Sequence, residues 1–553
     1  MNRISKLSSV LFFSGLMLCL ASSLNTVVTW TPLEYQLGLL SSLPMLFYVG
    51  FLLLLLGMLL SIKTDAEPLF ILKLALAFAV FQGIPSLFLS NPYRPDTYFF
   101  IKLTSDLMSH SFIPISQLAE AYAQFPGGVL SVGFIERVTG ISLFSLSQWF
   151  PMFSSAVTLL CAYVFYRRFL RDEISARLVT FISMFGLVYM QYYMVPQGFA
   201  LTPLLLLAIA LTYRSVEWRV IALLAMTFLI ITHPPTALFA ILLIGLTSIC
   251  QLLLPKLRIG NQSRELTSLY PSETGNSMTN MFLFSVVLWF GWFVFIAHGF
   301  FADIVGVLAN YFEAEAGLLA PREGEPFFTA LFWQLSESPY WFTSSIRTVA
   351  FLLTALYSSL SLWVLFSREN EIDAQTIPLA WIGAAYLFTI FWIVYSGLNL
   401  ADRGFLFLFL MAPLAAFKAL PYLRHARWRR TMIMFLLVLS IAQGSTLYRD
   451  SNQYIVPEQS LALPGFLELH VHRKIMGGYY IPWKSGRDIL PFYSINSPLP
   501  KSETAIIVID PYGKLWSQLA YAGSTDIEAI YACYENGSKI YGNGVHELYL
   551  AED

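Results

Sequence analysis

The sequence predicts an all-α polytopic membrane protein with about thirteen transmembrane helices, a cytoplasmic N-terminus and a small extracytoplasmic α/β domain at its C-terminal end. Three observations predict this fold class. Hydrophobic residues make up 57% of the chain and charged residues 12%, a composition unlike that of an ordinary soluble domain. Apolar windows long enough to cross a bilayer recur through residues 1–447. Lysine and arginine gather in the loops on one side of those windows.

Each predicted span holds roughly 20 mostly apolar residues, the helix length that crosses the hydrocarbon core. The spans cover residues 7–26, 37–61, 69–89, 146–166, 178–195, 198–213, 219–232, 235–254, 281–299, 346–366, 377–398, 404–420 and 431–447. In this arrangement the basic loop residues share one side, which the positive-inside rule assigns to the cytoplasm. These residues are Arg3, Lys6, Arg167, Arg168, Arg171, Arg177, Arg214, Arg219, Lys256, Arg258, Arg264, Arg424, Arg427, Arg429 and Arg430.

The outer side then receives two long segments, 90–145 and 299–345, and several short turns. The turns include Pro196–Gly198, His233–Pro235 and Ala401–Arg403. Within 90–145, two apolar stripes at helical spacing predict two helices that lie along the membrane surface. The stripes are Leu118, Tyr122 and Phe125, followed by Leu130, Phe134 and Val138. The segment 299–345 is long, aromatic and acidic, which is typical of a functional loop or a lid.

The pattern changes in residues 448–553, where hydrophobicity drops and a small α/β domain is predicted. Ala505–Ile509 is a run of strand-forming residues. Residues 538–541 and 546–549 flank Gly542-Asn543-Gly544 and predict a hairpin. The transmembrane domain is therefore expected over residues 1–447, with the second domain outside the membrane.

Charge and cysteine usage exclude several classes of function. The chain has 33 basic and 34 acidic residues, so it lacks the broad basic field that recruits nucleic acid. Its four cysteines show no spacing typical of a zinc site or a disulfide framework. Walker loops, dinucleotide fingerprints and nucleophile elbows are absent, which disfavours nucleotide-driven pumps and Rossmann-type enzymes.

Asp96 is the most informative polar residue, because Arg94 and Asp96 lie two residues apart where the third span leaves the lipid. A carboxylate at the membrane edge is costly unless it is paired or hydrated. Asp96 can be a general base that takes a proton from an acceptor hydroxyl. It can equally be half of a structural ion pair with Arg94 or Lys102. The residues alone weigh these two interpretations evenly.

Other polar residues are expected at the same face. Arg403 follows Asp402 at the mouth of an apolar helix, where a guanidinium can bind a lipid phosphate or, with Asp402, form an interfacial anchor. His233 can bind a phosphate or sugar oxygen, or be a turn histidine satisfied by the backbone. Gln197 and Glu313 are candidates for hydrogen bonds to a sugar, although ordinary turn and loop roles are favoured for both.

Metal binding is left open by the sequence. These motifs contain no second histidine or carboxylate at ligand spacing, but a site for a divalent ion such as Mg or Mn could combine Asp96 with distant loops. No other cofactor is predicted.

Several of these segments resemble the integral-membrane glycosyltransferases of the GT-C superfamily, especially archaeal-type members. The matching pieces are Pro95–Phe100, Ile113-Pro114, Tyr122–Gly127, His233–Phe239 and Lys539–Gly544. The resemblance implies a plasma-membrane enzyme that transfers a sugar or glycan, with inversion, from a polyprenyl-phosphate carrier such as dolichyl phosphate. The acceptor would be a lipid, a glycan or a protein at the outer face. An acidic residue of the first outer loop acts at the reacting centre, and Asp96 is the matching position, although Asp96-Thr97 stands where the family often has two acids.

Other functions fit the same class of protein. A glycan polymerase or ligase would use the same face and the same lipid phosphate with another acceptor. A transporter or flippase of lipid-linked glycans would need charged residues deep within several spans. The predicted spans are nearly free of charge, which disfavours transport. A non-catalytic membrane protein is the remaining alternative.

Overall fold

The structure is a computed structural model of the chain. It describes residues 3–24, 26–28, 37–109, 124–170, 172–186, 193–213, 215–257, 273–298, 341–366, 376–396, 401–422 and 425–447, and five strands between residues 474 and 551.

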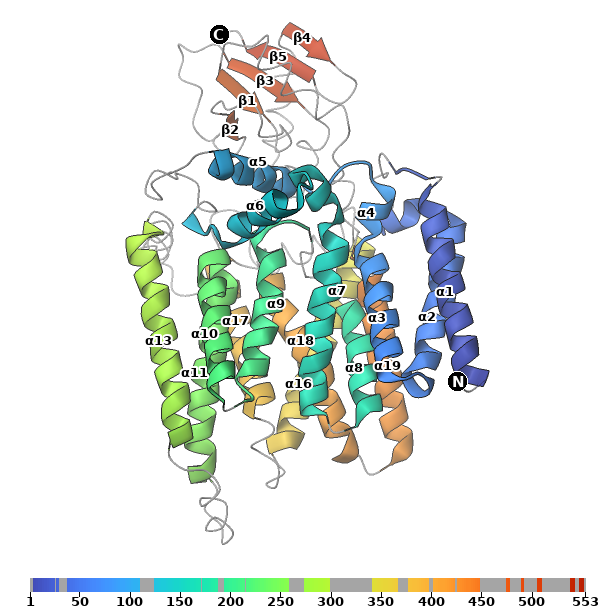
Figure 1. The fold of residues 1–553 in the computed structure, drawn as a ribbon, viewed down its shortest axis with the longest axis vertical. Coiled ribbons are helices and arrows are strands. Elements are labelled where there is room, and N and C mark those ends of the chain that lie inside the picture. Colours follow the sequence, from blue (N-terminus) through green and yellow to red (C-terminus); the bar gives the residue numbers. More distant parts are fainter. Residues whose placement is uncertain are drawn as a thin grey trace.

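Long helices stand side by side and form a bundle (Figure 1). They are α1 (Arg3–Leu24), α2 (Met45–Thr64), α3 (Glu67–Gln82), α7 (Leu143–Phe169), α8 (Glu173–Gly186), α9 (Pro196–Ala210), α10 (Val216–Thr232), α11 (Pro234–Leu257), α13 (Glu273–Phe295), α16 (Trp341–Phe366), α17 (Thr376–Ser396), α18 (Ala401–Ala419) and α19 (Ala426–Gly444). Each predicted span overlaps one of them. Short helical segments accompany the bundle: η1 (Gly38–Ser42), α4 (Ile84–Phe88) and η8 (Leu420–Tyr422).

Six helices within the described residues are long and apolar enough to cross a membrane. They lie in α1, α2, α7, α11, α13 and α16, and three shorter apolar helices lie in α9, α17 and α18. A helix satisfies all of its backbone polar groups internally, which is why apolar windows of this length fold as helices in lipid. Met17, Leu224 and Phe295 are 65%, 65% and 79% exposed, as expected for side chains that face lipid tails. The chain is a multi-pass membrane protein; the total of about thirteen spans stays a prediction.

Aromatic side chains fill the middle of the bundle. The Phe239 ring of α11 stacks on the Phe407 ring of α18, with 3.9 Å between centroids. The fully buried Trp381 of α17 donates its indole N–H to the Phe407 carbonyl at 2.8 Å. These contacts tie three helices into one core and leave the indole N–H satisfied.

Two helices lie across one end of the bundle, α5 (Pro95–Ser109) and α6 (Gly127–Thr139) (Figure 1). This end is called the outer end below, after the sequence prediction that it faces the outside of the membrane, and its orientation stays a prediction. No helix was predicted over Pro95–Ser109 of the first outer loop, yet these residues form α5. Proline is well suited to the first turn of a helix, where its missing N–H leaves no bond unmade.

Helix α6 fits a position along the membrane surface. Its stripe of Leu130, Phe134 and Val138 is 51%, 68% and 66% exposed, while Val129 and Val132 on the other face are buried. An apolar stripe that turns away from the protein suits the water–lipid boundary. The other predicted surface helix, around Leu118, lies outside the described residues.

Beyond the outer end, five strands form one mixed sheet in the order β2-β1-β3-β5-β4. Their bounds are β1 (Lys474–Gly477), β2 (Ile489–Pro491), β3 (Ala505–Ile509), β4 (Ser538–Gly542) and β5 (Glu547–Ala551). β1 pairs in parallel with β2 and β3, whereas β5 pairs antiparallel with β3 and β4. The predicted strand at Ala505–Ile509 and the terminal hairpin are present. The described residues of this predicted α/β domain are its strands alone, so its helical part and its extracytoplasmic location stay predictions.

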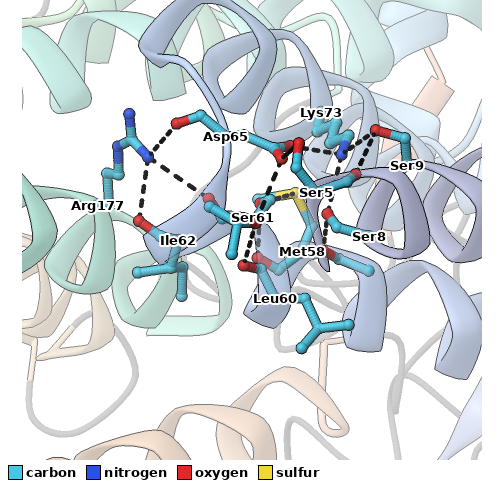
Figure 2. Close-up of polar contacts among 12 residues, drawn as sticks. Ser5, Ser8, Ser9, Met58, Leu60, Ser61, Ile62, Asp65, Lys73 and Arg177 are labelled. Atoms are coloured by element: carbon cyan, nitrogen blue, oxygen red, sulfur yellow. Dashed lines mark hydrogen bonds and ion pairs between the residues drawn. The ribbon is translucent and has the colours of Figure 1, made fainter. Parts of the chain in front are cut away.

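The prediction that the spans are nearly free of charge is wrong at the inner end of the bundle, where Figure 2 shows a buried ionic network. Lys73 of α3 and Asp65, which follows α2, have side chains that are 0% exposed, with the Lys73 Nζ 2.5 Å from the Asp65 Oδ2. Lys73 also donates to the hydroxyls of Ser8 and Ser9 at 3.0 Å, and the Ser5 hydroxyl donates to the Asp65 Oδ1 at 2.7 Å. All three ammonium protons therefore have acceptors.

Arg177 also differs from its prediction as a cytoplasmic loop residue. Its side chain is 5% exposed and lies on α8. The Nη1 donates to the carbonyls of Ile62 and Asp65 at 3.0 and 2.9 Å, at the C-terminus of α2, and the Nη2 pairs with Glu173. A guanidinium on terminal carbonyls caps the helix and opposes its dipole. The inner network thus joins α1, α2, α3 and α8. All three protons of the Lys73 ammonium are engaged in these contacts, so none is available for a proton relay.

Candidate active site

Two adjacent glycines at the start of α6 allow close packing at the outer end of the bundle. A Cβ at Gly127 would lie 2.2 Å from the Thr232 Oγ1 at the end of α10. A Cβ at Gly128 would lie 3.1 Å from the Phe100 ring of α5 and 3.2 Å from the Phe199 ring of α9. Because neither glycine has a side chain, α6 can lie directly on α5, α9 and α10. Four elements that are distant in sequence meet at this point.

Arg94 precedes α5 and lies against two tyrosines. Its guanidinium carbon is 4.7 Å from the centroid of the Tyr193 ring and 5.6 Å from that of Tyr93. Its Nη1 donates to the Tyr193 hydroxyl at 3.2 Å. Both tyrosines are buried, at 5% and 8% exposed, so the cation rests on rings that are shielded from water.

Asp96 is half-buried in the first turn of α5. Phe100 lies four residues later on the same helical face and stacks on Phe199 with 5.8 Å between centroids. Contacts to the start of α9 therefore lie on both sides of Asp96, through Arg94 before it and Phe100 after it. A carboxylate in the first turn is stabilised by the positive end of the helix dipole.

Gln197 occupies the first turn of α9, between Tyr193 and Phe199 in the sequence. Its side chain is buried, with the residue 6% exposed, and its Oε1 has no hydrogen-bond partner within the described part of the chain. The hydroxyl of Thr232, which is 0% exposed, is likewise unpartnered among the described residues. Buried oxygens without partners are uncommon and costly, which makes Gln197 a candidate for a ligand's hydroxyl group, whereas the Thr232 hydroxyl is enclosed beneath Gly127.

His233 follows Thr232 and begins the turn into α11. Its Nδ1 accepts the backbone N–H of Thr236 at 3.3 Å and lies 2.7 Å from the Thr236 Oγ1. This arrangement caps α11 and supports the turn-histidine interpretation for Nδ1. Any contact with a ligand would involve the other ring nitrogen.

Tyr98 adds a neutral polar group to the same turn of α5. Burial raises the pKa of its phenol, so the group stays protonated at physiological pH. Its ring packs edge-on against Phe144 of α7, with 6.5 Å between centroids. No pattern in the sequence distinguishes it from the many other tyrosines of the chain.

The remaining predicted residues are less closely defined. Lys102 is half-buried on α5, six residues after Asp96, which is about 9 Å of helical rise and about 120° around the axis. Asp402 and Arg403 belong to the first turn of α18, so the predicted turn at these positions is helical. Their side chains, and all of Glu313, lie outside the described residues. A shared crevice between Asp96 and Arg403 stays a prediction.

Among the described residues, no group of three or more histidines, cysteines, aspartates and glutamates could hold a metal ion. Asp96 therefore has no set of described ligands that fits a Mg or Mn ion, and a divalent ion at this position stays a prediction.

Two solved structures resemble this fold. The structure of ArnT from Cupriavidus metallidurans in the apo state has a TM-score of 0.45 and 11% sequence identity, and the likeness covers 88% of this chain and 98% of that one. The structure of the same protein bound to undecaprenyl phosphate has a TM-score of 0.44 and 11% identity, with 87% and 97% covered. No model of a protein family matches the chain, and neither does any curated protein sequence.

Proposed function

We propose that this chain is a membrane glycosyltransferase that transfers a sugar or glycan from a polyprenyl-phosphate carrier to an acceptor at the outer end of the bundle. Asp96 takes the proton from the acceptor hydroxyl. The acceptor oxygen then bonds to the anomeric carbon, the bond from that carbon to the phosphate oxygen breaks, and the lipid phosphate leaves. Attack opposite the leaving phosphate inverts the anomeric centre.

One observation supports this proposal: Arg94, next to the start of α5 and two residues before Asp96, donates to Tyr193 just before α9, the helix whose first turn holds the buried Gln197. Asp96, Arg94 and Gln197 have the groups that such a transfer requires. The carboxylate serves the acceptor, the guanidinium suits the phosphate, and Gln197 suits a sugar hydroxyl. The exposed apolar stripe of α6 is consistent with a position of these residues near the lipid headgroups.

The inner network gives little support to transport as the alternative function. Lys73 and Asp65 lie in the interior, as a coupling site would, but their protons and oxygens are bound to serines and to each other. A transport site exchanges such partners with its cargo. The network is better explained as an anchor between helices.

The proposal is tested with the purified full-length chain in lipid nanodiscs. Radiolabelled sugars on undecaprenyl and dolichyl phosphate are supplied with a mixture of lipid, glycan and peptide acceptors. Transfer releases the polyprenyl phosphate and labels an acceptor. A chain that instead moves labelled lipid across sealed vesicles, with no new glycosidic bond, would be a flippase.

Gln197→Met is expected to raise the KM for the sugar donor by about tenfold with little change in kcat. The substitution keeps the volume of the side chain but removes the amide that would accept a sugar hydroxyl, and a lost hydrogen bond of this kind is worth about 0.5–1.5 kcal/mol. Steady-state kinetics measure the KM and kcat of the variant and the wild type. An unaltered or lower KM would remove Gln197 from the sugar site.

Arg403→Ala is expected to weaken binding of the lipid-phosphate donor by about tenfold or more, since a charge-assisted contact is worth roughly 1.5–3 kcal/mol. Arg403→Lys should recover part of the affinity, because a lysine retains the charge but not the paired donors. Equilibrium binding in nanodiscs is the measurement, and unchanged affinity in both variants would leave Arg403 as an interfacial anchor.

A further inference from the structure

We infer that Tyr193 is a positioning residue that holds Arg94 for the phosphate of the lipid carrier; this inference rests on the function proposed above. Tyr193 precedes α9, and no sequence motif marks it. It is 99 positions from Arg94 along the chain, yet its hydroxyl accepts the Arg94 guanidinium.

The backbone of Arg94 is the first indication. Its φ is +74°, and among the described residues no other non-glycine has a positive φ. A residue with a Cβ is strained in this left-handed region and stays there only when its surroundings fix it. Strain of this kind is concentrated at functional sites, which makes Arg94 a candidate for a ligand contact.

Both ends of the strained residue are tied into α5. The backbone N–H of Thr97 donates to the Arg94 carbonyl at 3.2 Å, and the Thr97 hydroxyl donates to the Tyr93 carbonyl at 2.9 Å. Thr97 is adjacent to Asp96. The direction of the Arg94 side chain and the position of the Asp96 carboxylate are therefore set by the same turn.

Tyr193 is itself rigidly held. Its carbonyl accepts the Val195 N–H at 2.9 Å, and the Val195 carbonyl accepts the Gly198 N–H at 2.9 Å, so a tight turn leads directly into α9. The neighbouring Met194 is fully buried in one cluster with Phe100. A ring anchored in this way can fix the guanidinium that stacks on it.

The stacking geometry favours a phosphate. The rings of Tyr93 and Tyr193 meet edge to face with 6.4 Å between centroids, and both lie within 6 Å of the guanidinium carbon. The ring contacts and the bond from Nη1 to the Tyr193 hydroxyl restrict the rotation of the guanidinium, whose N–H groups are the kind that binds phosphate. The two tyrosines would thus orient the plane of the phosphate-binding group.

Binding to undecaprenyl phosphate tests the inference in the full-length chain in nanodiscs, with undecaprenol as the phosphate-free control. The variants are Tyr193→Leu, Tyr193→Phe, Arg94→Met and the double variant Arg94→Met with Tyr193→Leu. Tyr213→Leu is the matched control, because Tyr213, in the connection between α9 and α10, makes a similar contact: the guanidinium carbon of Arg168 of α7 lies 4.6 Å from the centroid of its ring.

Tyr193→Leu is expected to weaken undecaprenyl phosphate binding by about tenfold and Tyr193→Phe by about threefold, since the phenylalanine keeps the ring but loses the hydroxyl. Undecaprenol binding and Tyr213→Leu should be unaffected. In the Arg94→Met background, Tyr193→Leu should cause no further loss, because the tyrosine acts through the arginine. A residue that merely packs would not show this coupling.

Two results would overturn the inference separately from the proposed function. If Arg94→Met weakens binding but both Tyr193 variants bind as the wild type does, Tyr193 does not position Arg94. Additive losses in the double variant would likewise show that the two residues act independently. If the wild type binds undecaprenyl phosphate no better than undecaprenol, the proposed function itself fails and the inference falls with it.

Discussion

Asp96→Asn is expected to lower kcat for sugar transfer by about 10²–10⁴-fold, the usual contribution of a positioned general base. Asparagine has nearly the same shape as aspartate but cannot take up the acceptor proton. The half-buried side chain is in the first turn of α5, where losing a negative charge costs about 0.3–1 kcal/mol of helix stability. The fold should therefore persist while the reaction stops.

The matched control for this substitution is Asp106→Asn. Asp106 lies on the same helix but is exposed, ten residues after Asp96. Transfer rate, donor affinity and melting temperature should be compared for both variants. Undiminished turnover in Asp96→Asn would remove Asp96 from the chemistry. A large fall in melting temperature, with donor affinity and turnover per folded molecule preserved, would instead identify Asp96 as half of a structural ion pair.

The helices of the bundle could be predicted from the sequence because the bilayer leaves few alternatives. An apolar segment of about 20 residues must satisfy its backbone internally, and hydropathy alone reveals it. Helix α5 was missed because it begins within the polar sequence Arg94-Pro95-Asp96, which is typical of a loop. A proline at the start of a helix was the signal that could have corrected the prediction.

The site was predictable only in part. Arg94, Asp96 and Gln197 are unusual residues at the ends of apolar windows, so position and type indicate them directly. Tyr193 and Thr232 give no such signal, since tyrosine and threonine are common at the ends of membrane helices. Their importance comes from contacts between α5, α6, α9 and α10, which depend on tertiary packing and not on local pattern.

The inner network shows the same limitation. Lys73 fell within a predicted span, and Asp65 fell in the short connection before it. A single charge in a long apolar window does not alter its hydropathy enough to mark it. Lys73 and Asp65 are eight residues apart in the sequence. Their ion pair forms because α3 folds back against α2, with the serines of α1 in contact.

Lys73→Met is expected to destabilise the protein by about 3–5 kcal/mol, because it leaves the Asp65 carboxylate buried without its counter-ion. Among the described residues, the hydroxyls of Ser5 and Thr64 would remain as its hydrogen-bond donors, at 2.7 and 3.4 Å. Lys63→Met is the matched control, since Lys63 is exposed in the last turn of α2. Thermal unfolding in nanodiscs should show a large fall in melting temperature for the first variant and almost none for the second.

Replacing both charged residues distinguishes two contributions to stability: that of the intact ion pair and the cost of leaving one ion buried without its partner. The double variant Asp65→Leu with Lys73→Met should recover most of the lost stability, because well-packed apolar residues often replace a buried ion pair at little cost. Transfer per folded molecule should stay near the wild-type level in both variants, since the network lies at the opposite end of the bundle from α5 and α6 (Figure 1). If Lys73→Met melted like Lys63→Met yet abolished activity, the ionic network would belong to the mechanism and the assignment as an anchor would be wrong.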